Sequence, residues 1–130
     1  MHTNTAAGAI TRMVDAFPPD KQEIIRMNMS MSLLGVVAQQ LVPTNDGGRI
    51  LACEVMVATQ AIRALIRENN VHQLDNYIKS GGNDGMILMD DSLMELFQKG
   101  IISDDNLIRY AINVPQMEKN IGSARKQPNI

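Results

Sequence analysis

Apolar residues recur every three or four positions in the first seventeen residues, which is the spacing of a helix that buries one face. They are Ala6, Ile10, Met13, Val14 and Phe17. Asn4 or Thr5 can cap this helix, and the following Pro-Pro pair ends it because proline donates no backbone hydrogen bond. Asp20 and Glu23 have the spacing of an acidic capping box, so we expect a second helix to begin there.

The pattern changes between Met27 and Leu41, where apolar residues surround most of the helical circumference. One face carries Met27, Met31, Leu34, Ala38 and Leu41. This distribution predicts a helix that is buried on several sides, with its methionines packed in the core. Met27–Ser32 also alternates apolar and polar residues with a period of two, as a strand would, but the length of the run favours the helix.

A β-hairpin is expected next. Val42–Gly48 contains Asp-Gly-Gly, which supplies the positive-φ positions of a hairpin turn. Arg49–Val57 is a nearly continuous apolar run of strand length, and Gln39–Val42 is its expected antiparallel partner. This hairpin is the only β structure that the sequence predicts.

The chain after the hairpin has helical spacing and predicts four short helices. Thr59, Asp90 and Ser103 can cap three of them, and Gly81 with Gly82 can end the other. Past Gln116 the chain becomes polar and basic. We therefore expect a folded part over residues 1–115 and a polar, flexible tail over residues 116–130.

Composition and charge exclude several classes of protein. The 130 residues, 45% hydrophobic and 20% charged, suit one soluble globular domain. A net charge of −2 gives no general attraction to nucleic acid, and the apolar runs are too short to insert into a membrane. No basic region followed by an apolar stretch is visible before the first helix, so we expect no signal peptide. The single cysteine, Cys53, excludes an internal disulfide framework and fits a reducing cytosol.

Candidate chemistry is scarce. No stretch matches G-x-x-x-x-G-K-[ST], the loop whose backbone N–H groups surround phosphates, so the chain lacks its own Walker A motif. Met86–Asp91 imitates the apolar strand and acidic pair that hold magnesium, but a helix N-cap explains it better. His2, Cys53 and His72 have no partner at metal-ligand spacing, which predicts no metal site.

Two arginines stand one helical turn apart in Ala61–Glu68. Arg63 and Arg67 are expected to point away from the apolar face of their helix. A solvated helix face is the simple interpretation. The alternative is that two aligned guanidinium groups bind a carboxylate or a neighbouring subunit.

Three stretches in order resemble the pilus-retraction ATPases of the type II/IV secretion ATPase family. His2-Thr3-Asn4-Thr5-Ala6-Ala7 resembles the histidine box. Ala61–Glu68 resembles the A-I-R-N-L-I-R-E signature of retraction motors and departs from it only at Ala64. Gly82–Leu93 resembles G-x-x-G-M-x-T-M-D-x-S-L, with Leu88 in place of threonine. The absence of a four-cysteine zinc element after the core also favours the retraction branch.

The resemblance implies a fold, an activity and partners. The fold would be α-rich α+β, the C-terminal portion of a RecA-like P-loop ATPase core with one β-hairpin and about six helices. The family works as a homohexameric ring that binds ATP and Mg²⁺ and pulls on an inner-membrane platform protein from the cytoplasm. His2 would sense the γ-phosphate, since an imidazole can donate to a phosphate oxygen.

By the same resemblance, seven residues would form the motor's output surface. They are Ala61, Ile62, Arg63, Leu65, Ile66, Arg67 and Glu68. Because the chain lacks both Walker motifs, we expect no ATP hydrolysis from it alone. The alternative function is a stand-alone helical interaction module that binds a partner through Arg63 and Arg67.

Overall fold

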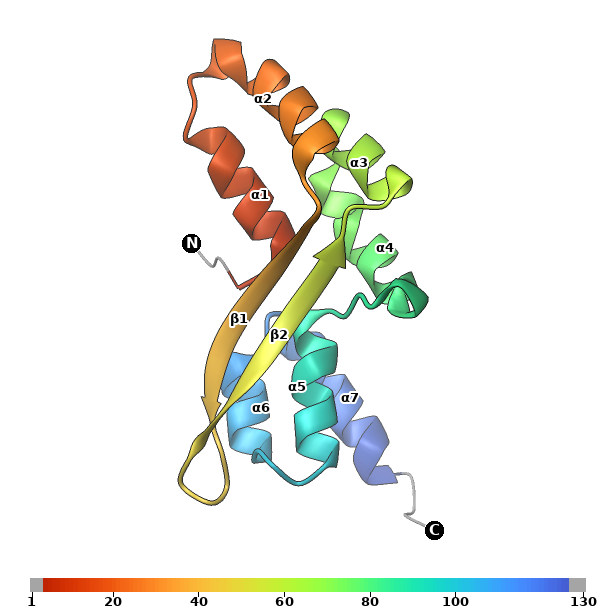
Figure 1. Ribbon diagram of the computed structural model, residues 1–130. Coiled ribbons are helices and arrows are strands. Elements are labelled where there is room, and N and C mark those ends of the chain that lie inside the picture. Colours follow the sequence, from red (N-terminus) through yellow and green to blue (C-terminus); the bar gives the residue numbers. More distant parts are fainter. Residues whose placement is uncertain (1–3, 127–130) are drawn as a thin grey trace. The chain divides into compact units, whose positions relative to one another are not determined.

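The computed structural model describes residues 4–126, which form seven α-helices and one two-stranded sheet (Figure 1). The described chain divides into two compact units. The first unit contains the chain up to Gln39 together with Cys53–Leu88, and the second contains Gln40–Ala52 together with the chain from Met89 onward. The expected α-rich fold with one hairpin is confirmed, with seven helices in place of about six.

The hairpin consists of β1 (Gly35–Pro43) and β2 (Arg49–Val57), and each strand is divided between the two units. In the turn, the Thr44 N–H donates to the Gly48 carbonyl at 2.9 Å, and Gly47 has a φ of 91°. Glycine adopts this left-handed conformation without steric cost, so the predicted Asp-Gly-Gly turn is confirmed. Alternate side chains of the strands are buried: Ala38, Val42, Ala52, Glu54 and Met56.

The first unit contains α1 (Ala6–Asp15), α2 (Pro19–Ser32), α3 (Gln60–Arg67) and α4 (Leu74–Ser80), with 3₁₀ turns η1 (Val71–Gln73) and η2 (Gly82–Asp84). Two predicted caps are confirmed. The Thr5 hydroxyl accepts the Gly8 N–H at 3.0 Å, and the Thr59 hydroxyl accepts the Ile62 N–H at 3.3 Å. The core residues of this unit are Ala6, Ile10, Met56, Ile62, Leu65, Ile66, Leu74, Ile78 and Met86.

The second unit packs α5 (Met89–Gln98), α6 (Asp104–Tyr110) and α7 (Val114–Lys126) on the turn end of the hairpin (Figure 1). The Ser103 hydroxyl accepts the Asn106 N–H at 3.1 Å, which confirms the predicted cap of α6. The described buried residues of this unit are all apolar: Val42, Ala52, Met89, Leu93, Ile102, Leu107, Met117 and Ile121.

The prediction of one buried helix from Met27 to Leu41 is wrong. Helix α2 ends at Ser32, Leu33 has an extended backbone, and β1 begins at Gly35 rather than at Gln39. Met27–Ser32 is helical, so the helix was the correct choice there. The expected burial fails, however, because Met31 is 67% exposed and Ser30 is the buried residue of α2.

Tertiary pairing decides where α2 gives way to β1. A Cβ atom on Gly35 would lie 2.8 Å from the Met56 carbonyl oxygen, so only a glycine lets the two backbones approach this closely here. The β-branched Val36 and Val37 that follow favour a strand. Local helical spacing could not reveal this pairing, because Met56 is distant in the sequence.

Two predicted caps do not form. Helix α2 starts after Pro18 without a side-chain cap, so Asp20 and Glu23 make no capping box. Asp90 lies inside the first turn of α5 rather than before it. Its carboxylate accepts the N–H groups of Ile112 at 2.7 Å and Asn113 at 3.0 Å, just ahead of α7.

The polar segment after Gln116 is helical as far as Lys126. Met117 and Ile121 lie four residues apart on α7 and are buried in the second unit. The flexible tail expected from residue 116 is therefore replaced, up to Lys126, by an amphipathic helix. Among the side chains of this helix that the structure describes, two are buried, and two apolar residues are hard to notice among so many polar ones.

Candidate functional site

The residues of the predicted output surface lie in the first unit. His2, the predicted phosphate sensor, lies outside the described residues, but Thr5 and Ala6 of the same histidine box begin α1. The predicted output surface, Ala61–Glu68, lies on α3, and Glu68 is the residue that ends the helix. The last stretch, Gly82–Leu93, runs from η2 into α5.

Burial divides six of the seven predicted output residues into two groups. Ile62, Leu65 and Ile66 are buried in the core of the first unit. Ala61, Arg67 and Glu68 are exposed. The exposed group is the part of this set that can meet a partner in the structure as described.

Arg63 does not share the exposure of Arg67. It is half-buried, and its Nη1 donates to the Ser30 carbonyl oxygen at 2.7 Å. Ser30 lies in the last turn of α2, where carbonyl groups lack helical partners and the helix dipole is negative. A guanidinium group suits both needs, so Arg63 links α3 to the end of α2.

Sequence reasoning missed a buried carboxylate on β2. Glu54 is 2% exposed, and its carboxylate accepts the N–H of Ala6 at the start of α1. A buried charge is costly unless hydrogen bonds compensate for it, and a negative group is favoured at a helix N-terminus. The sequence did offer one signal. Glu54 is two residues from both Ala52 and Met56, so all three side chains lie on the same, inward face of the strand.

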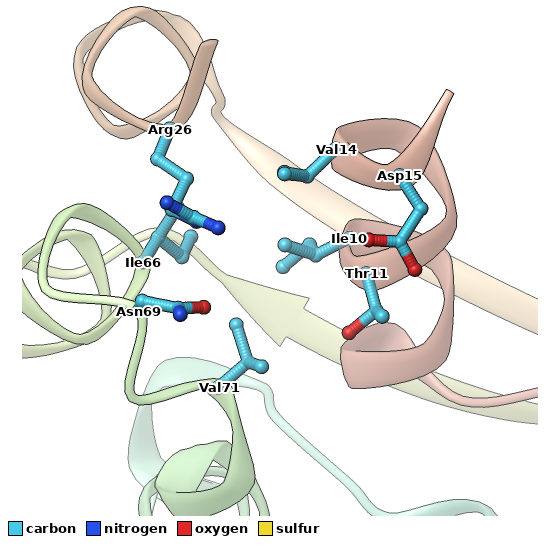
Figure 2. Close-up of a pocket in the computed structure, with 8 residues that line it drawn as sticks. All are labelled: Ile10, Thr11, Val14, Asp15, Arg26, Ile66, Asn69 and Val71. Atoms are coloured by element: carbon cyan, nitrogen blue, oxygen red, sulfur yellow. The ribbon is translucent and has the colours of Figure 1, made fainter. Parts of the chain in front are cut away.

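A small cavity of about 80 Å³ lies among α1, α2, the end of α3 and η1 (Figure 2). Its lining residues are Ile10, Thr11, Val14, Asp15, Arg26, Ile66, Asn69 and Val71. Figure 2 shows the Arg26 side chain extending from α2 toward the middle of the cavity. Asn69 follows α3 with a φ of 59°, a left-handed conformation that asparagine tolerates better than most residues. The cavity is large enough for a small polar group and too small for a nucleotide.

A more open groove of about 480 Å³ lies between α1 and α2. Its lining residues are Met13, Ala16, Phe17, Ile25, Asn28, Met29 and Ser32. The groove offers apolar contact area but no titratable side chain. It therefore supplies packing rather than acid–base chemistry.

Residues 4–126 contain neither a cluster of metal-ligating side chains nor a Walker A loop. Within residues 4–126, no group of three or more histidine, cysteine, aspartate or glutamate side chains could hold a metal. The sequence contains no phosphate-binding loop. Nor does any helix in this part of the chain have the length and apolarity needed to cross a bilayer.

Known proteins match this chain in both sequence and fold. The type IV pilus retraction ATPase PilT of Pseudomonas aeruginosa is 43% identical over 116 residues, which are 89% of this chain and 33% of that protein. The twitching motility protein of Neisseria gonorrhoeae is 39% identical over 118 residues, 90% of this chain and 32% of that protein. No protein-family model matches the chain.

A crystal structure of the pilus retraction motor PilT with bound ADP has the same fold. It matches with a TM-score of 0.80 at 34% identity, over 92% of this chain and 33% of that chain. This chain thus spans about a third of the length of the relatives that it matches. We conclude that it belongs to the secretion ATPase family and is homologous to the C-terminal part of the type IV pilus retraction ATPases.

Proposed function

We propose that this chain is the C-terminal segment of a hexameric, ATP-driven motor that powers type IV pilus retraction and twitching motility. The observation that carries the proposal is the 43% identity with a retraction ATPase over 116 residues. The retraction-type signature at Ala61–Glu68 supports the same branch. In this proposal the motor works in the cytoplasm at the inner-membrane base of the pilus and acts on a platform protein there.

ATP and Mg²⁺ would be bound mainly by residues of the motor that lie outside this segment. His2 would contribute the γ-phosphate sensor, because an imidazole can donate a hydrogen bond to a phosphate oxygen and gain charge near neutral pH. The output surface would use the exposed Arg67 and Glu68. Its buried members, Ile62, Leu65 and Ile66, would hold α3 in place.

A chimera tests the proposal. The matching third of the P. aeruginosa retraction ATPase is replaced by this chain and expressed in cells that lack their own retraction motor. We expect a ring that hydrolyses ATP and restores twitching. A chimera that assembles but neither hydrolyses ATP nor restores twitching would show that the proposal is wrong.

The output surface is tested by reversing one exposed charge in the same chimera. Arg67→Glu should abolish twitching and leave ATP hydrolysis within about threefold of the parent, because the change lies outside the nucleotide site. Arg109→Glu is the matched control, since Arg109 is an exposed arginine in the last turn of α6. If the two variants restore twitching equally, Arg67 does not act in the output surface.

The purified 130-residue chain tests whether this segment needs the rest of the motor for ATP hydrolysis. The proposal expects no ATP turnover by this chain alone. Arg63 contacts Ser30, so a module would have to bind its partner mainly through Arg67 rather than through an arginine pair. Magnesium-dependent hydrolysis by the pure chain would contradict the proposed division of labour.

A further inference from the structure

Strand β2 holds two of the three motif stretches through adjacent residues. Glu54 accepts the N–H of Ala6, which belongs to the histidine box. Val55 exchanges two backbone hydrogen bonds, of 2.9 and 3.1 Å, with Ile87, which lies inside the stretch Gly82–Leu93. One short piece of strand therefore contacts both stretches through residues of the first unit, Ala6 and Ile87.

The contact between Glu54 and Ala6 joins residues 48 positions apart in the sequence. Thr5 already satisfies the Gly8 N–H, and Glu54 satisfies the Ala6 N–H, so two donors of the first turn of α1 have partners. Both Ala6 and Glu54 are almost completely buried, at 0% and 2% exposure. Water therefore cannot easily replace the carboxylate.

We propose that Glu54 is a positioning residue for the phosphate sensor: its buried carboxylate holds the histidine box through the Ala6 N–H. The proposal rests on the proposed function, because it assumes that the box acts in ATP hydrolysis. Glu54 does not touch the nucleotide in this mechanism. It fixes the backbone from which the histidine box acts, and a small misplacement of a catalytic group lowers the rate of a reaction strongly.

The test compares Glu54→Leu with Glu54→Gln in the active chimera. Leucine removes the acceptor but suits the apolar neighbours Ala52 and Met56, whereas the glutamine carbonyl can still accept the Ala6 N–H. We expect Glu54→Leu to lower kcat at least about tenfold with KM for ATP changed less than about twofold. Glu54→Gln should restore kcat to within about threefold of the parent. Glu95→Leu, an exposed site on α5, is the matched control and should change neither constant.

Hydrogen exchange at the Ala6 amide, measured in the 130-residue chain, reports the contact itself. Exchange should be at least about tenfold faster in Glu54→Leu and close to the parent in Glu54→Gln. Loss of protection and loss of kcat should therefore occur in the same variants. If Glu54→Leu fails to fold, Glu54→Met, whose thioether is at most a weak acceptor, replaces it in the same pair of measurements.

Four outcomes are decisive. A Glu54 variant that loses Ala6 protection but keeps its kcat would overturn the inference, as would a variant that loses kcat with Ala6 still protected. Parallel loss in the leucine variant and retention in the glutamine variant would support it. An inactive parent chimera would refute the proposed function itself, and the inference with it.

Discussion

The two units differ in how they use buried polar groups. In the first unit, the buried Glu54 carboxylate accepts the distant Ala6 N–H, and the backbone carbonyl of the buried Ser30 accepts a hydrogen bond from Arg63. In the second unit, the described buried residues are all apolar, and polar groups such as Asp90 act near the surface. Buried polar groups cost free energy unless they are paired, and they fix one arrangement when they are. The histidine box and the output signature belong to the first unit, which contains these buried hydrogen bonds.

The largest effect should come from truncating a core side chain in each unit. Ile66→Ala and Leu107→Ala each remove a completely buried side chain and should cost about 2–5 kcal/mol of stability. If the units unfold separately, hydrogen exchange should accelerate mainly in the unit that carries the change. Equal acceleration in both units would show that they unfold as one.

A smaller effect should separate the two arginines of α3. Arg63→Met removes the partner of the Ser30 carbonyl and should lower the free energy of unfolding by about 1–3 kcal/mol. Arg67→Met changes an exposed side chain and should stay within about 0.5 kcal/mol of the parent. Urea unfolding measures both. The structural role assigned to Arg63 is wrong if the two variants have the same midpoint.

Helix caps offer an equal test in the two units. Thr59→Ala removes the cap of α3, and Ser103→Ala removes the cap of α6. Each change should cost about 1 kcal/mol, because one N–H in the first turn loses its acceptor. Thermal unfolding followed by circular dichroism checks this. If Ser103→Ala lowers the unfolding midpoint and Thr59→Ala does not, the Thr59 cap contributes nothing to stability.

The smallest effect concerns pH and the hairpin turn. The hydrogen bond from the Thr44 hydroxyl, followed by that from the Gly48 N–H, holds the pKa of Asp46 below its ordinary value. The ionised carboxylate therefore stabilises the turn above the unfolded pKa of about 4, and this contribution is lost as the pH falls through the lower folded pKa.

Asp46→Asn should remove that part of the acid sensitivity. Amide exchange in the hairpin, corrected for its intrinsic pH dependence, should show loss of protection below about pH 4 in the parent and a flatter profile in the variant. The distant Asp105→Asn, an exposed aspartate on α6, is the control. Identical profiles for the parent and Asp46→Asn would rule out the contribution of this carboxylate.

Local chemistry predicted much of the fold. Thr5, Thr59 and Ser103 cap helices as their positions indicate, and the turn after Val42 forms from its Asp-Gly-Gly. The same kind of reasoning failed between Met27 and Leu41, since Gly35 meets Met56 only in the folded chain. Apolar spacing there fits a helix, but pairing with β2 decides the outcome.

The site was less predictable than the fold. Arg63 and Arg67 lie one turn apart on the same helix, and the sequence does not distinguish them. They differ in burial because Arg63 binds the Ser30 carbonyl, 33 residues away on another helix. Glu54 can be noticed in the sequence because it is a charged residue inside an apolar strand. Its partner, the backbone of Ala6, leaves none, because every residue except proline carries such an N–H.

Gly35 also constrains how this sequence can vary. In a library that randomises single positions and selects folded chains, position 35 should return glycine almost alone, since any side chain would collide with the Met56 carbonyl. Gly82 has no atom within 4 Å of the place for a Cβ and should accept many replacements. The sequence at the junction between α2 and β1 should therefore vary little among folded variants, whereas exposed positions should accept many residues.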